Sequence, residues 1–186
     1  GYVDVTATPS YPFESSATET GRSVVLSFIV ADPANPCRPS WGAAYGLDDA
    51  QTTLDLDRRI ARFVQNGGDV SVSFGGQANS ELATECTDAA DLKLAYEQVI
   101  DRYKLTTIDL DIEGDSLADT DAGLRRAEAI ASIQADRRAD GKSLNVWLTL
   151  PVSTAGLADT GIAAVDQMLA ARVNLTGVNA MTMDFG

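Results

Sequence analysis

Short apolar segments and amphipathic helical patterns alternate along the whole chain. Six segments rich in β-branched and apolar residues predict strands, and they occupy residues 2–6, 23–30, 69–74, 106–112, 144–150 and 177–183. Between them, a helical spacing of apolar side chains predicts helices over residues 56–65, 88–103, 121–138 and 162–171. Strict alternation of strand and helix is typical of an α/β fold, with a parallel sheet and helices packed outside it.

The connections after the second and third predicted strands favour one kind of parallel sheet. An open doubly wound sheet and a barrel both satisfy the alternation. Residues 31–54 and 75–90 are long and polar, and in a barrel such connections build the active face at the carboxyl ends of the strands. We therefore predict a (β/α)8 TIM barrel, of which this chain covers about the first six βα units. Such a barrel needs ~250 residues, so we expect one incomplete domain over residues 1–186, with strands seven and eight outside the chain.

Charge and composition exclude several classes of function. The net charge of −13 and the pI of about 4.2 would repel a nucleic-acid backbone or an anionic membrane, so we expect neither as a partner. No apolar run approaches the ~20 residues that span a bilayer. Histidine is absent, which excludes Ser-His-Asp and Cys-His catalysis and removes the commonest metal ligand. Any chemistry must come from carboxylates, hydroxyls or the substrate itself.

Two cysteines, Cys37 and Cys86, lie one in each long connection. They are too few and too far apart for a zinc or redox motif. One disulfide, joining two loops of the active face, is the simplest interpretation, and two free buried thiols are the alternative. A disulfide favours a secreted, extracellular protein.

Three carboxylates lie in the fourth predicted strand, within the stretch TTIDLDIEGD. Successive strand side chains point to opposite faces, so Asp109, Asp111 and Glu113 share one face of the strand. Unpaired acids inside a barrel are costly, and they are usually retained for chemistry, a metal or a basic partner. A structural acid cluster satisfied by hydrogen bonds is one alternative, and Mg²⁺ binding through these oxygen ligands is another.

Three separated motifs occur in order on the third, fourth and sixth predicted strands. They are SFGG at residues 73–76, DLDIE at 109–113 and MTMDFG at 181–186. Together they resemble glycoside hydrolase family 18, whose chitinases and endo-N-acetylglucosaminidases are (β/α)8 barrels. The opening YVDVTATPSYP also resembles the first strand of the bacterial chitinase D-like branch. The resemblance covers essentially the whole chain, and it implies a single catalytic barrel domain.

The resemblance implies a retaining, substrate-assisted hydrolysis of β-1,4-linked N-acetylglucosamine polymers such as chitin. Glu113 would be the general acid and base, Asp111 would orient the acetamido group of the substrate, and Asp109 would modulate Asp111 from a deeper position. Asp184 would bind the substrate by a hydrogen bond, and Met181 would line the site. No cofactor and no metal are implied, and the complete protein is expected to be a monomer.

Supporting roles in substrate binding fall on two further groups of residues. Ser73, Gly75 and Gly76 are expected to shape the floor around the acids, because glycine allows close backbone approach. A tight turn between strand and loop explains the two glycines equally well. In the second-strand connection, Trp41 and Tyr45 are candidates for stacking on sugar faces, or for anchoring the loop.

The sequence departs from the family pattern at three positions. Thr106 stands where the family usually has a leading aspartate, Met183 where many members have a tyrosine, and Phe185 follows the sixth-strand aspartate. The missing phenol removes one hydrogen bond to the acetamido group. A non-catalytic, chitin-binding or lectin-like barrel of the same family is therefore the alternative function.

Overall fold

Six parallel strands follow one another across the sheet in the order of the chain. The computed structural model describes residues 1–15 and 22–183. Each strand pairs in parallel with the next, and the six are β1 (Tyr2–Asp4), β2 (Ser23–Asp32), β5 (Asp69–Gly75), β6 (Thr107–Asp111), β7 (Asn145–Ser153) and β9 (Leu175–Met181). This sequential order confirms the barrel-type sheet, because a doubly wound sheet reverses its order at a switch point. Over the described residues the sheet stays open, since β1 pairs only with β2 and β9 only with β7.

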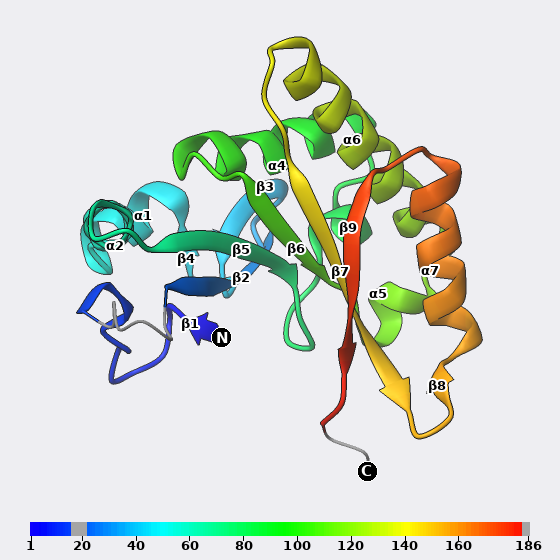
Figure 1. Cartoon of the computed structure of the whole chain (residues 1–186), viewed down its shortest axis with the longest axis horizontal. Helices are drawn as coiled ribbons and strands as arrows, with labels where there is room; N and C mark the ends of the chain where they lie inside the picture. The colour runs from blue at the N-terminus through cyan, green and yellow to red at the C-terminus, as the bar shows by residue number, and fades with distance from the viewer. Residues whose placement is uncertain (16–21, 184–186) are drawn as a thin grey trace.

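Helices follow the strands and cover the outer side of the sheet, from α2 beside β5 to α7 beside β9 (Figure 1). The four main ones are α2 (Leu56–Gln65), α4 (Ala89–Arg102), α6 (Thr120–Ala139) and α7 (Asp159–Ala170), in agreement with the predicted positions. In α2, the side chains of Leu56, Ile60 and Phe63 form the buried stripe. Asp88 begins α4 by accepting hydrogen bonds from two backbone amides of its first turn. Within the described residues, no helix is long and apolar enough to cross a membrane.

The connection after β2 contains secondary structure that the sequence pattern did not predict. It forms β3 (Asn35–Trp41), which runs antiparallel to β2, followed by β4 (Tyr45–Gly46) and α1 (Leu47–Thr53). The remaining short elements are η1 (Phe13–Ser15), α3 (Leu82–Glu85), α5 (Gly114–Ala118) and β8 (Gly156–Leu157). Of the two long polar connections, the one after β2 is thus a structured insertion, and the one after β5 contains the short helix α3.

The disulfide predicted between the two long connections is present. Cys37 in β3 and Cys86 at the end of α3 are bonded, with their Cα atoms 4.6 Å apart. The bond joins the β2 insertion to the β5 connection. Both connections leave the carboxyl ends of neighbouring strands, where the predicted site lies.

Candidate active site

Strand β6 carries two buried carboxylates to the carboxyl edge of the sheet. Asp109 is 3% exposed and Asp111 is 5% exposed. The apolar residues that alternate with them along the segment are completely buried, so both faces of the strand are covered. The strand ends at Asp111, and Glu113 precedes the short helix α5 as its N-cap residue. The backbone of Glu113 remains extended, with φ −134° and ψ 168°, so the alternation predicted from the sequence continues one step past the strand. Asp111 and Glu113 share a side-chain hydrogen bond.

Three hydroxyl groups surround the carboxylate of Asp109. Ser73 Oγ on β5 donates to Oδ2 at 2.7 Å, Tyr2 on β1 donates its phenol to the same oxygen at 2.9 Å, and Thr149 Oγ1 on β7 donates to Oδ1 at 2.6 Å. Asn179 on β9 in turn donates to Thr149 Oγ1 at 3.2 Å. Burial raises the pKa of Asp109, and the three hydrogen bonds oppose that rise. Strands β1, β5, β7 and β9 thus converge on one acid of β6.

Tyr2, Thr149 and Asn179 were not predicted as site residues. Each lies on a strand that the sequence pattern did predict, but a hydroxyl or amide on a strand carries no signal of its own. The signal lies in the register, which aligns Ser73 with Asp109 and Thr149 with Asp111 across neighbouring strands. Register between parallel strands depends on the whole sheet, so it is not available from local pattern.

Asp111 lacks compensation of this kind. Its Oδ1 atom is buried and has no hydrogen-bond partner in the described part of the chain. Burial, followed by the charges of Glu113 and Asp109, raises the pKa of Asp111 from 3.8 to about 8. The raised pKa favours the protonated form of this carboxyl at neutral pH.

Two glycines bring the end of β5 against the backbone of Asp111. Gly75 has φ +103°, and a Cβ atom there would lie 2.1 Å from the carbonyl oxygen of Asp111. Gly76, with φ +85°, donates its amide to that same oxygen at 2.8 Å. Only glycine fits at Gly75, since any side chain would collide with this carbonyl. Close packing against Asp111 therefore explains why glycine occupies Gly75. Contact of Gly75 and Gly76 with substrate remains a prediction.

The other predicted substrate-binding residues do not all reach the acids. Trp41 is completely buried, and its indole N–H donates to the phenol oxygen of Tyr103 at 3.0 Å. The prediction that Trp41 stacks on a sugar face is therefore wrong, because an aromatic ring in the core exposes no surface. Tyr45 is half-buried in β4 and packs against the core. Met181 is the half-buried last residue of β9, and Asp184 lies outside the described residues.

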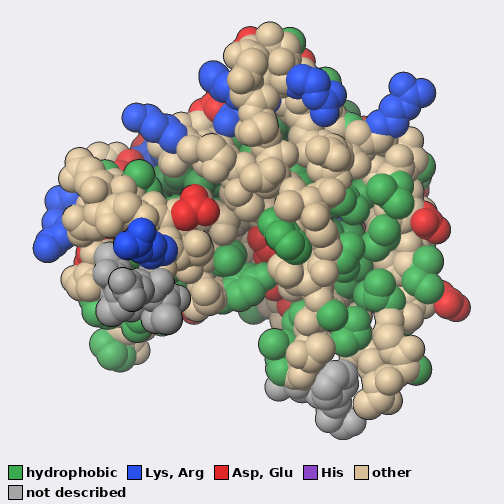
Figure 2. Space-filling view, viewed as in Figure 1, with side chains coloured by type: hydrophobic (Ala, Val, Ile, Leu, Met, Phe, Trp, Pro, Cys, Tyr) green, Lys and Arg blue, Asp and Glu red, His purple; other side chains and the backbone are tan. Residues whose placement is uncertain are grey.

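A hollow opens between the lobe of α1 and α2 and the lobe of β9 and α7, with acidic and apolar side chains at its back (Figure 2).

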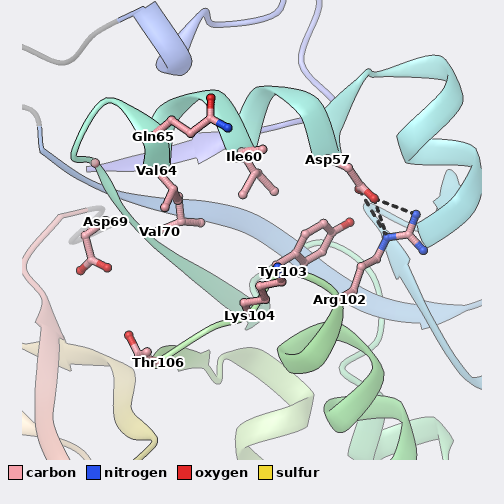
Figure 3. Close-up of a pocket in the computed structure, with 12 residues that line it drawn as sticks. Asp57, Ile60, Val64, Gln65, Asp69, Val70, Arg102, Tyr103, Lys104 and Thr106 are labelled. Carbon is pink, nitrogen blue, oxygen red and sulfur yellow. Dashed lines mark hydrogen bonds and ion pairs between the residues drawn. The ribbon is translucent and has the colours of Figure 1, made fainter.

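A separate cavity of about 490 Å³ lies between α2 and α4 (Figure 3). That cavity is lined by the first residues of β5 and by Thr106, which precedes β6, so it lies at the opposite end of the strands from Asp109 and Asp111. Among the described residues, no group of three His, Cys, Asp or Glu side chains could hold a metal ion.

Comparisons with known proteins agree with this geometry. No family model matches the chain. The chain is 38% identical over 162 residues to the "Probable bifunctional chitinase/lysozyme" of Escherichia coli K12, and 36% identical over 162 residues to "Endochitinase 11" of Metarhizium anisopliae. The catalytic domain of a hyperthermophilic chitinase from Pyrococcus furiosus superimposes with a TM-score of 0.82 at 27% identity, covering 99% of this chain and 56% of that one. The chain is chitinase-like, of glycoside hydrolase family 18.

The family 18 fold extends to more distant structures. A family 18 chitinase from Chromobacterium violaceum matches the whole chain with a TM-score of 0.71 at 17% identity, which supports the fold alone. The two curated relatives each match 87% of this chain, which in turn spans 18% and 30% of their lengths. The comparisons therefore apply to the part of a barrel that this chain contains.

Proposed function

We propose that this chain provides the acid-bearing half of a retaining glycoside hydrolase that cleaves β-1,4-linked N-acetylglucosamine polymers such as chitin. The observation that carries the proposal is the hydrogen-bonded pair of Asp111 and Glu113, with the pKa of Asp111 raised to about 8. A carboxyl that remains protonated at neutral pH beside a second carboxyl is the arrangement from which acid catalysis starts. The names of the two curated relatives and the motif order support the same substrate class.

In the proposed reaction, the proton held by Asp111 passes to Glu113, which donates it to the glycosidic oxygen as the bond to the anomeric carbon breaks; Asp111 is left as a carboxylate. The carbonyl oxygen of the substrate's own N-acetyl group attacks the anomeric carbon, giving a cyclic oxazolinium ion. Asp111 accepts a hydrogen bond from the acetamido nitrogen as it becomes positive, and this orients the carbonyl for attack. Glu113, now a carboxylate, removes a proton from water as the water opens the ring. Two inversions leave the configuration unchanged.

Asp109 has a supporting role in this scheme. Its negative charge, held by three hydroxyl donors, lies two residues from Asp111 on the same strand. This charge is one cause of the raised pKa of Asp111. We further infer that the protein acts outside the cell, because the disulfide between Cys37 and Cys86 persists in oxidising surroundings.

The test is the substitution Glu113→Gln in the full-length protein, assayed with a fluorogenic chitobioside. Loss of general acid catalysis should lower kcat by ~10²- to 10⁴-fold, while binding of chito-oligosaccharides survives. Glu128→Gln, an exposed change on α6, is the matched control and should leave kcat unchanged. Product released by the wild type should appear first as the β-anomer in a proton NMR spectrum. A wild type that binds chitin without turnover would instead identify a lectin-like barrel.

A further inference from the structure

A second buried carboxylate, Glu81, lies close to the site without belonging to the acid cluster. Glu81 is 1% exposed and caps α3 by accepting the backbone amide of Ala83 at 2.9 Å. Arg126 of α6, 2% exposed, donates to the same carboxylate oxygen through Nη2 at 2.8 Å and Nε at 3.2 Å. The phenol of Tyr96, on α4, donates to the other oxygen. Burial, followed by the charge of Glu81, raises the pKa of Tyr96 well above its usual value, so this phenol keeps its proton.

These contacts tie the connection after β5 to two helices of the outer layer. The guanidinium of Arg125, the neighbour of Arg126, donates to the carbonyl oxygen of Ala83 at 2.8 Å. The connection therefore receives donors from α6 at Glu81 and again two residues later. With the disulfide at Cys86, three points fix it within a short stretch of chain.

The same connection touches Asp111 and the helix that follows Glu113. Gly75 lies between Asp111 and Glu81: a Cβ atom on it would be 2.1 Å from the Asp111 carbonyl oxygen and 3.4 Å from Glu81 Cγ. On the other side of α3, Thr84 Oγ1 donates to Ser116 Oγ at 3.3 Å, and Ser116 belongs to α5, the helix that Glu113 caps. A shift of Glu81 would therefore move the supports of Asp111 and Glu113 together.

We propose that the buried pair of Glu81 and Arg126 is a positioning device, which holds the β5 connection against β6 and α5 and so sets the geometry of Asp111 and Glu113. The inference rests on the proposed function, since it assigns these residues a part in the same reaction. They act through Gly75, Gly76 and α3 rather than by touching the substrate. A purely structural pair would contribute to stability alone.

The chain offers a matched control for the loss of one buried ion pair. Arg59 of α2 donates through Nε to Glu14 of η1 at 3.1 Å, and the two side chains are 9% and 16% exposed. This second pair ties η1 to the helix α2, and neither of its residues belongs to β6, α5 or the β5 connection. Glu14→Gln and Glu81→Gln therefore remove the same charge from similar pairs in different places.

The experiment measures Tm, kcat and KM for both variants in the full-length protein, with chitobioside turnover recorded well below Tm. Both changes should lower Tm. Glu81→Gln alone should lower kcat by at least about tenfold with KM changed by less than about threefold, because displacement of catalytic groups by 1 Å can cost ~10²-fold. A Glu81→Gln protein with the kcat of Glu14→Gln would overturn the proposal.

A triple variant separates position from stability. Glu81→Leu, Arg126→Met and Tyr96→Phe together leave no buried charge or hydroxyl without a partner, and such replacements are often neutral or stabilising. Among the described residues, the one group that loses its acceptor in this cluster is the backbone amide of Ala83, so a part of the loss in Tm, that of one backbone hydrogen bond, should remain. We expect the rest of the loss in Tm to recover in this protein while kcat stays at least about tenfold low, since apolar packing does not restore the directed contacts. Recovery of both Tm and kcat would contradict the inference. If the wild type itself shows no turnover, the proposed function fails instead, and the two failures are thereby distinguished.

Discussion

Glu81 and Asp111 are two carboxylates buried to nearly the same extent, at 1% and 5% exposure, and they lie next to the same glycine. Their partners differ. Glu81 accepts four hydrogen bonds, two of them from the guanidinium of Arg126. Asp111 has a buried oxygen without a partner in the described chain, and its neighbours Glu113 and Asp109 are acids.

The difference shows how burial can serve two purposes in one short region. A buried charge with a full set of donors is fixed in place. A buried acid next to other acids keeps its proton and holds it ready for transfer. The contrast therefore depends on partners rather than on depth.

Among the changes that test this contrast, Asp111→Asn has the largest expected effect. The amide keeps the size of a protonated carboxyl but cannot accept the acetamido N–H in the same way or balance its developing charge. Turnover should fall by ~10²- to 10³-fold, as for loss of one preorganised electrostatic contact, with KM nearly unchanged. Chitobioside hydrolysis at neutral pH measures this, and retention of more than a tenth of the wild-type kcat would remove Asp111 from the mechanism.

The same variant should change how stability depends on pH. The folded-state pKa of Asp111, about 8, lies above its ordinary value of 3.8. Folding therefore takes up a proton between these values, and the contribution of Asp111 to stability falls as pH rises through that window. Asp111→Asn removes this contribution. The Tm of the variant should therefore rise relative to the Tm of the wild type as the pH increases from 4 to 8. A Tm difference that stays constant across the window would show that Asp111 titrates normally.

A smaller effect is expected from the hydroxyls around Asp109. Ser73→Ala removes a buried hydrogen bond to a charged carboxylate, worth about 1.5–3 kcal/mol of unfolding free energy. Ser71, on the same strand, donates to the carbonyl oxygen of Val24 at 3.3 Å, and Ser71→Ala should cost about 0.5–1.5 kcal/mol. Urea unfolding at neutral pH compares the two. Equal losses would indicate that Asp109 is not charged in the folded protein.

The smallest effect is expected at Asp115, an exposed acid in the first turn of α5. It lies two residues past Glu113 but outside the buried cluster. Asp115→Asn should change the free energy of unfolding by about 0.5 kcal/mol or less and leave turnover near normal. A large loss of kcat here would extend the acid cluster beyond Glu113.

Much of the fold follows from local pattern. The six parallel strands and four main helices were predicted because buried strands and amphipathic helices have different apolar periods. The insertion of β3 and β4 was missed because its sequence, with Pro36 and Pro39, is typical of a loop. The prediction for Trp41 failed for a related reason: once this insertion folds onto α4, its aromatic residue becomes core.

The acids of the site were predicted, and their environment was not. Alternation along one strand places Asp109, Asp111 and Glu113 on a common side, and the motif order identifies the family. The hydrogen bonds that Asp109 accepts, and the bond between Glu81 and Arg126, connect residues that are 36 or more positions apart in the sequence. Such contacts depend on register and on helix rotation, which single-segment patterns leave undetermined.

The insertion on β2 gives the rim of the site an anchored base and an exposed tip. Its base is bonded to α3 through Cys37 and packed on α4 through Trp41. Its tip is the turn between β2 and β3, where Ala34 donates its amide to the side chain of Asp32 at 2.8 Å. Residues exchanged or added at this turn change the rim without disturbing the strands that hold the acids. The insertion therefore offers a place where a loop can be lengthened or shortened while Asp109 and Asp111 keep their surroundings.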